Sequence, residues 1–327
     1  DLIFDTSKNY FTEHVGERVL APTWGGYKDM KEIPLSLSYL QEAKRAGMKI
    51  TPLLHNDFDS QETKKLLHDS GAVQNLARKI TATALVYDFD GWNLDFENMD
   101  EADKFLYTKF IKTVSEKLHM HGKEISVDVT VNSNSPNWSL CYDRKGMAAY
   151  VDYEVIMGYD QTPGGSRYSG PVSSYSWLKH HIAMLLKQVP NNKLVLGLPF
   201  YTRIWTGKEG QAASSVLMMK QIKSLLGQNN IGLFWNPEDR QYVGIWEENG
   251  QTRKVWFEER RSLQEKVSLA HDYKLAGLAF WRYGFETEDI YDQIEGAFLN
   301  KKDESVRYKN RSEDILIKFR ERLKRAQ

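Results

Sequence analysis

Short apolar runs alternate with longer amphipathic stretches along most of the chain. The short runs predict β-strands, and the stretches with apolar residues three or four positions apart predict helices that bury one face. The predicted strands are residues 2–5, 18–24, 48–55, 92–97, 124–131, 153–159, 193–200 and 275–281. The predicted helices are residues 38–46, 60–81, 101–121, 172–188, 258–271 and 288–299.

This alternation is typical of parallel strands joined by helical crossovers. Eight such units predict an α/β fold closed into a (β/α)8 TIM barrel rather than an open sheet. We expect the barrel to occupy residues 1–299. The active site of such a barrel lies at the carboxyl ends of its strands, so chemistry is sought there first.

One interval interrupts the alternation, between the seventh and eighth predicted strands. It contains a helical pattern at residues 214–226 and two strand-like runs at 242–247 and 252–257. The two runs flank Asn249-Gly250, a pair typical of a type I′ hairpin. We therefore predict a small α+β insertion at residues 204–257 that forms a wall beside the active face; the alternative is a decorated surface loop.

The last segment, residues 300–327, is charged and net basic and is predicted to be partly helical. Its apolar residues would lie on one helical face: Ile315, Leu316, Phe319 and Leu323. We expect this face to pack against the barrel or a partner. A basic helix at a membrane surface is the less favoured alternative.

Charge and cysteine content narrow the function classes. Lys+Arg and Asp+Glu are 44 each, so no overall positive field would attract nucleic acid or an anionic membrane, and a neutral polymer such as a polysaccharide suits the chain better. A single cysteine, Cys141, excludes an internal disulfide.

The chain begins at Asp1, and we expect any targeting segment to lie outside it. Histidine pairs occur without further ligands at metal spacing, so no metal or cofactor is predicted.

The strand predicted at residues 92–97 carries the candidate chemistry. Side chains alternate along a strand, so Asn93, Asp95 and Glu97 point to one side and the intervening apolar residues to the other. In a barrel the apolar set packs under the helices, and the polar set enters the barrel. Buried acids and amides are costly, which favours a catalytic role; a hydrogen-bond network that only stabilises the barrel is the alternative.

Two carboxyl groups separated by one residue on the same face cannot both ionise freely. One of them is expected to keep its proton at a raised pKa. A proton on Glu97 makes this residue a general acid, and Asp95 is then the partner that shares or receives the proton.

Four segments, in order, resemble the motifs of glycoside hydrolase family 18. Asp90-Gly91-x-Asn93-x-Asp95-x-Glu97 resembles the family's Asp-Gly-x-Asp-x-Asp-x-Glu signature on the fourth strand. The other three segments resemble its motifs on the sixth to eighth strands: Met157-Gly158-Tyr159-Asp160, then Gly-Leu-Pro-Phe-Tyr-Thr-Arg at residues 197–203, and Ala279-Phe280-Trp281. Asn93 departs from the family, since an aspartate stands there in the signature. Together with Tyr159-Asp160-Gln161 and Gly170-Pro171-Val172, it resembles the branch of bacterial spore and cell-wall lytic enzymes.

The resemblance implies roles for these residues. Glu97 would protonate the leaving oxygen while the substrate's own 2-acetamido oxygen attacks the anomeric carbon, a retaining, substrate-assisted reaction. Asp95 would hold the acetamide N–H, and Asn93 would alter how Asp95 exchanges its proton. The remaining implied contacts to the sugar are Tyr159, Asp160, Trp281, Tyr201, Arg203 and Gln161. We add Trp24 as a candidate at the end of the second strand, and Trp138 as a possible stacking platform in the loop after the fifth strand.

The predicted function is hydrolysis of β-1,4-linked N-acetylglucosamine polymers by a monomeric enzyme. A peptidoglycan N-acetylglucosaminidase, with spore cortex among its substrates, is the leading hypothesis, and a chitinase is the enzymatic alternative. A lectin-like barrel that binds chitooligosaccharides is the non-enzymatic alternative. A structural barrel that holds a partner through the basic tail has less support. We expect a bacterial protein that is secreted or associated with the cell envelope or spore.

Overall fold

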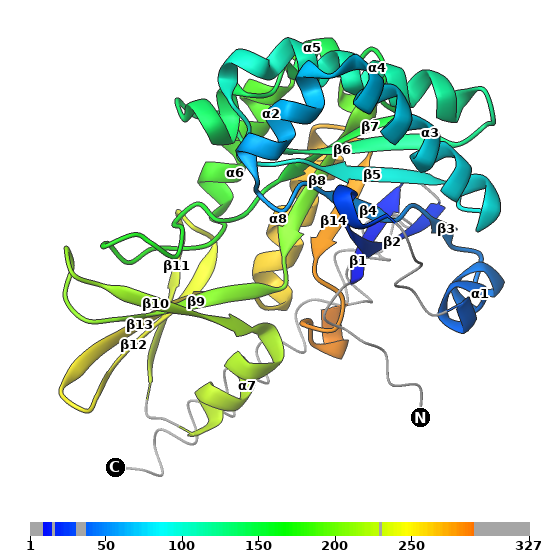
Figure 1. The fold of residues 1–327 in the computed structure, drawn as a ribbon. Helices are drawn as coiled ribbons and strands as arrows, with labels where there is room; N and C mark the ends of the chain where they lie inside the picture. Colours follow the sequence, from blue (N-terminus) through cyan, green and yellow to red (C-terminus); the bar gives the residue numbers. More distant parts are fainter. Residues whose placement is uncertain (1–8, 15–16, 31–36, 229–230, 291–327) are drawn as a thin grey trace.

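A closed ring of strands forms the centre of the molecule (Figure 1). The computed structural model describes residues 9–14, 17–30, 37–228 and 231–290. Within these residues the sheet runs in the order β1-β14-β8-β7-β6-β5-β4-β2-β3, and a pairing of β1 with β2 closes the barrel. The strands of this sheet are β1 (Asn9–His14), β2 (Glu17–Gly26), β3 (Lys49–Ile50), β4 (Leu53–His55), β5 (Gly91–Asp95), β6 (Glu124–Thr130), β7 (Tyr153–Met157), β8 (Leu194–Pro199) and β14 (Gly277–Trp281).

Strand β1 differs from the prediction of eight parallel strands. It pairs antiparallel with both β2 and β14, whereas the remaining pairings of the barrel are parallel. Only two residues separate β1 from β2, and so short a connection permits an antiparallel pair but no crossover. The strand predicted at residues 2–5 lies outside the described residues. Every other predicted strand range contains a strand.

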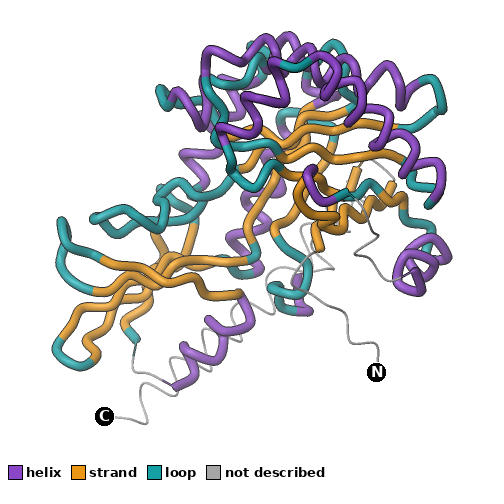
Figure 2. Tube along the Cα trace, in the orientation of Figure 1, coloured by secondary structure: helices purple, strands orange, loops and turns teal. Residues whose placement is uncertain are grey.

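Helices cover the outside of the barrel (Figure 2). They are α1 (Leu37–Arg45), α2 (Ser60–His68), α3 (Ser70–Val86), α4 (Lys104–His119), α5 (Arg144–Met147), α6 (Tyr175–Leu185) and α8 (Arg260–Asp272). The single helix predicted at 60–81 is wrong, because Asp69 interrupts it. The Asp69 backbone is extended, and its carboxylate accepts hydrogen bonds from the N–H groups of Gly71 and Ala72, which caps a new helix.

A second, antiparallel sheet stands between β8 and β14 in the chain and lies to one side of the barrel (Figure 1). It has the order β10-β9-β13-β12-β11. Its elements are β9 (Tyr201–Thr206), β10 (Ala213–Met218), α7 (Met219–Gln228), β11 (Gly232–Asn236), β12 (Gln241–Glu248) and β13 (Gln251–Phe257). The helix predicted at 214–226 is wrong in its first part, where β10 pairs with β9 instead. The predicted hairpin is present, with positive φ at both Asn249 and Gly250.

Polar contacts fix this second sheet to the helical layer of the barrel. Lys266 of α8 is fully buried and forms an ion pair with Glu258, which directly follows β13. The same carboxylate accepts a 2.8 Å hydrogen bond from the Gln241 side chain of β12. The Tyr175 N–H at the start of α6 donates to the Asp239 carbonyl at 2.9 Å, and the Arg240 guanidinium lies 3.7 Å from the centre of the Tyr175 ring. The sheet is therefore held to the barrel by buried and charged contacts.

The described part of the chain contains no helix with the length and apolar character needed to cross a bilayer. The segment predicted as a tail, residues 300–327, lies outside the described residues. Most of the helix predicted at 288–299 does as well, and its described beginning is a short 3-10 helix, Glu288–Ile290.

Candidate active site

Strand β5 separates polar from apolar side chains as the sequence predicts. Trp92, Leu94 and Phe96 are fully buried in the core between the barrel and the helices. The Trp92 indole N–H donates to the Ile80 carbonyl of α3 at 2.9 Å. The strand itself ends at Asp95, so Glu97 lies two residues beyond it, in the loop at the carboxyl edge of the barrel.

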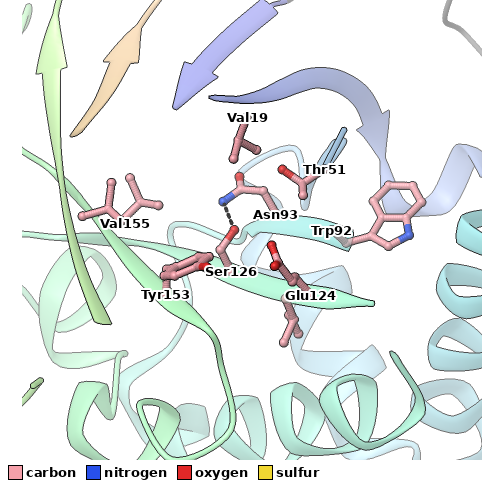
Figure 3. A pocket seen from close by; sticks show the side chains of 10 residues that line it. Val19, Thr51, Trp92, Asn93, Glu124, Ser126, Tyr153 and Val155 are labelled. Atoms are coloured by element: carbon pink, nitrogen blue, oxygen red, sulfur yellow. Dashed lines mark hydrogen bonds between the residues drawn. The ribbon is translucent and has the colours of Figure 1, made fainter. Parts of the chain in front are cut away.

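Asn93 is buried and bridges to the neighbouring strand β6. Its amide nitrogen donates to the Ser126 hydroxyl at 3.0 Å (Figure 3) and to the Asp128 carboxylate at 2.9 Å. Asp128 is a buried acid that the sequence reasoning missed. The alternation of side chains along residues 124–130 could have revealed it, because Asp128 shares its face of β6 with Ser126.

Burial and mutual repulsion raise the pKa values of these acids. The pKa of Glu97 is raised to about 9, first by burial and then by the negative charges of Asp95, Asp128 and Asp160. Burial also raises the pKa of Asp95. The pKa of Asp128 is raised by burial and by the charge of Asp95. The hydrogen bond from Asn93 lowers this pKa but is the smaller effect. Glu97 is therefore protonated at neutral pH, the state that a general acid requires.

A second polar group faces Glu97 from β7 and β9. The Tyr201 hydroxyl donates a 2.8 Å hydrogen bond to Asp160, and an Arg203 guanidinium nitrogen lies 4.0 Å from the same carboxylate oxygen. The rings of Tyr159 and Tyr201 meet edge to face with centroids 6.1 Å apart. The charge of Asp160 contributes to the raised pKa of Glu97, so this group belongs to the same site. The structure thus brings together four of the residues that the sequence predicts around Glu97.

Trp281 ends strand β14 beside these residues. Its ring is half-buried and packs on an apolar cluster inside the barrel that includes Ala21, Val155 and Val195. Its carbonyl accepts a 2.7 Å hydrogen bond from the Phe200 N–H, next to Tyr201. The position suits a floor beneath a sugar ring.

Two predicted contacts have other surroundings. Trp24 is buried on the helix side of the barrel, where its ring lies 5.4 Å from that of Trp92 and 6.0 Å from that of Phe89. It faces outward because Ala21, three residues earlier in β2, occupies the barrel interior. Gln161 accepts a 2.8 Å hydrogen bond from the Ser174 N–H with its side-chain oxygen. The Trp24 ring therefore packs with the core on the helix side of the barrel. The Gln161 side chain is engaged by Ser174 in the loop that leads to α6.

Two exposed aromatic rings flank the loop that carries Glu97. Phe58, after β4, is 57% exposed, and Trp138, after β6, is 43% exposed. Their ring centroids are 6.0 Å apart. The Asn98 side chain donates to the Phe58 carbonyl at 2.9 Å, which places the pair next to Glu97. Exposed aromatic surface of this kind offers a face for sugar stacking.

Toward the amino ends of its strands, the barrel holds a small cavity of about 20 Å³, lined in part by Asn93 and Ser126 (Figure 3). It is lined by residues at the amino ends of the strands, among them Val19, Thr51, Tyr153 and Val195. Such a volume accommodates about one water molecule and no sugar. Across the described ranges, no cluster of three or more His, Cys, Asp or Glu side chains could hold a metal ion.

A mostly parallel barrel with a glutamate of raised pKa and two aspartates near the carboxyl edge of its strands has the arrangement in which barrel enzymes place their active sites. A sequence profile of the glycosyl hydrolases family 18 matches residues 25–286. The chain therefore belongs to the glycosyl hydrolases family 18, a family of glycoside hydrolases.

Individual relatives agree with this assignment. The uncharacterized glycosylase YvbX of Bacillus subtilis (strain 168) is 26% identical over 265 residues, which cover 78% of this chain and 76% of that protein. A cortical fragment-lytic enzyme of the same strain is 26% identical over 246 residues; the match covers 72% of this chain but only 56% of that enzyme. The crystal structure of a chitinase from Chromobacterium violaceum has the same fold, with a TM-score of 0.76 and 20% identity over 89% of this chain and 90% of that chain.

Proposed function

We propose that the protein cleaves β-1,4-linked N-acetylglucosamine polymers with retention of anomeric configuration, and that Glu97 is the catalytic acid. One arrangement carries the proposal: Glu97, whose pKa is raised to about 9 by burial and by neighbouring acids, lies at the carboxyl edge of the barrel beside half-buried Asp95. A protonated carboxyl group can donate to the glycosidic oxygen as the bond breaks.

The nucleophile in this scheme is the substrate's own 2-acetamido oxygen, as in the substrate-assisted exceptions to the two-carboxylate mechanism. The carbonyl oxygen of the acetamide attacks the anomeric carbon, the glycosidic bond breaks, and the leaving oxygen takes the proton of Glu97. Water then opens the oxazolinium-like intermediate and returns a proton to Glu97. Asp95, whose Oδ1 is buried without a hydrogen-bond partner among the described residues, is placed to accept the acetamide N–H.

The remaining residues hold the sugar in our proposal. Tyr159 binds the acetamide carbonyl, and Trp281 forms the apolar floor beneath the ring. Asp160, held by Tyr201, contacts the sugar. Arg203 and the exposed pair Phe58–Trp138 contact units further along the polymer. This scheme requires a 2-acetamido group on the sugar that is attacked, which excludes cellulose and starch.

We favour peptidoglycan, including spore cortex, over chitin as the substrate. The support is the likeness to a cortical fragment-lytic enzyme and Asn93 in place of the aspartate of the family signature. We propose accordingly that the protein is a bacterial enzyme, secreted or associated with the cell envelope or spore, that acts as a monomer. The enzymatic alternative, a chitinase, uses the same acid and the same acetamide.

Product analysis separates these possibilities. The protein is incubated with purified cortex peptidoglycan and, in parallel, with N-acetylglucosamine oligomers, and the new reducing ends are reduced with borohydride and identified by mass spectrometry. New N-acetylglucosamine reducing ends from peptidoglycan are expected. Muramic acid reducing ends would contradict a glucosaminidase, and turnover of the oligomers alone would favour the chitinase. Binding of both polymers without new reducing ends would indicate a lectin-like barrel.

A further inference from the structure

The loop after β4 holds the backbone of Glu97 through one side chain, Asn56. Asn56 is 1% exposed. Its amide oxygen accepts a 3.0 Å hydrogen bond from the Glu97 N–H, and its amide nitrogen donates to the Glu97 carbonyl at 2.8 Å. The second hydrogen of the same nitrogen points to the Thr63 hydroxyl at 2.9 Å. Both donors of the amide and one acceptor are thus used, which fixes its orientation.

These bonds replace the strand pairing that Glu97 lacks. The last pair between β4 and β5 is His55 with Asp95, so the peptide groups of Glu97 lie beyond the end of the sheet. A side-chain amide carries the same donor and acceptor as a peptide group, and Asn56 continues the pairing by one further step. The carbonyl of Phe96 is held as well, by the Tyr142 hydroxyl at 2.9 Å. Glu97 therefore lies in a loop but is fixed as firmly as a strand residue.

Both loops adopt conformations that need such support. Asp57 and Phe58 have φ of 54° and 56°, and Asn98 has φ of 53°. Left-handed backbone at residues other than glycine is unfavourable and persists where surrounding contacts impose it. Asn98 returns a 2.9 Å hydrogen bond from its side chain to the Phe58 carbonyl. Hydrogen bonds from Asn56 and from Asn98 therefore join the loop after β4 to the loop after β5, and Glu97 lies in the segment that they hold.

We propose that Asn56 is a positioning residue for the acid: through the main chain of Glu97, it sets where the carboxyl proton stands relative to the glycosidic oxygen. The inference rests on the proposed role of Glu97. Proton donation depends steeply on the placement of the donor, and a displacement of about 1 Å can cost on the order of a hundredfold in rate. Asn56 itself needs no contact with the sugar to have this effect.

The experiment compares two leaving groups. Sugar leaving groups need a proton from the acid, whereas 2,4-dinitrophenolate departs without one. Turnover of N-acetylglucosamine oligomers and of the 2,4-dinitrophenyl glycoside of chitobiose is measured for wild type, Asn56→Ala and Asn56→Asp. Asn56→Asp keeps the shape and the acceptor for the Glu97 N–H but lacks the donor for the Glu97 carbonyl, so it serves if the alanine variant does not fold. Thr81→Val, which removes a buried hydrogen bond to the Ala77 carbonyl in α3, is the matched control for lost stability.

For both Asn56 variants we expect kcat/KM on the oligomers to fall about tenfold to a hundredfold, while kcat/KM on the dinitrophenyl glycoside stays within about twofold. The ratio kcat/KM is compared because it reports bond cleavage and excludes the later water step, in which Glu97 takes up a proton whatever the leaving group. Thr81→Val should have a melting temperature similar to that of the Asn56 variants but turn over both substrates at the wild-type rate. Equal losses on the two substrates, or no loss on the oligomers, would overturn the proposal. Glu97→Gln is measured alongside: if it hydrolyses oligomers at the wild-type rate, the role of Glu97 fails, and that outcome is distinct from a failure confined to Asn56.

Discussion

The Tyr201 hydroxyl donates a 2.8 Å hydrogen bond to the Asp160 carboxylate and thereby joins the second sheet to the barrel at the site itself. Tyr201 begins β9, and Asp160 follows β7. Asp160 has a positive φ of 56°, a conformation that aspartate tolerates better than most residues. The position of this carboxylate is therefore set by a tyrosine of another sheet.

Tyr201→Phe removes this hydrogen bond and keeps the ring. A hydrogen bond to a charged group contributes about 1.5–3 kcal/mol, and the half-exposed setting of Asp160 places the loss at the lower end. We expect kcat/KM on N-acetylglucosamine oligomers to fall about tenfold. Tyr168→Phe, on an exposed tyrosine of the β7–α6 loop, is the control and should match wild type. An unchanged kcat/KM in Tyr201→Phe would show that Asp160 needs no such anchor.

Glu97→Gln keeps the shape of the acid and removes its proton. We expect kcat to fall by about 10²–10⁴, the usual contribution of a positioned general acid. Affinity for N-acetylglucosamine oligomers, measured by titration calorimetry, should stay close to that of wild type, since the aromatic and polar contacts remain. Loss of binding together with activity would instead point to a folding defect, which the melting temperature would reveal.

The raised pKa of Glu97 predicts the alkaline side of the pH profile. The acid is active while protonated, so kcat/KM should fall as pH rises through the pKa of Glu97, near 9 rather than near the ordinary value of a glutamate. Asp160→Asn removes one of the negative charges that raise this pKa and should move the decline to lower pH. A profile with its alkaline midpoint between about 4 and 5 in wild type would contradict the assignment of the acid.

Asn93→Asp restores the family aspartate but replaces a donor to Asp128 with a second buried acid. We expect the pKa of the new carboxyl group to lie above the ordinary range in the folded protein. Such a group binds its proton more tightly when folded than when unfolded, so its contribution to stability is present at low pH and is lost as pH rises. The variant should melt near the wild-type temperature at about pH 4 and be less stable by about 1–3 kcal/mol at about pH 8.

Ser126→Ala is the control for this variant. It removes the other acceptor of the Asn93 amide and adds no titratable group. Its difference in melting temperature from wild type should therefore be the same at both pH values. A pH-independent difference in Asn93→Asp would mean that the new carboxyl group is not held in a raised-pKa environment.

Much of the architecture could be predicted from periodicity, because buried strands and amphipathic helices differ in their repeats. The antiparallel β1 could not, since its order depends on closure with β14 at the far end of the chain. Residues 214–218 were predicted as helix from local pattern, whereas pairing with β9 makes them a strand. At the site, Glu97 and Asp95 follow from one strand and its motif. Asn56 and Asp128 do not, because their importance depends on which strands are neighbours in the closed barrel.

The ion pair between Lys266 and Glu258 is buried, and the contact of Arg240 with Tyr175 joins the same two parts of the molecule. Both contacts affect the entropic cost of binding a polymer. These contacts form within the folded chain, so the second sheet and the barrel have a fixed relative position before a polymer binds. The second sheet is ordered during folding, so its ordering adds no entropic cost when a polymer binds. Glu258→Gln would weaken this ion pair and let the second sheet move relative to the barrel. Each binding event would then include the entropic cost of fixing the sheet in place.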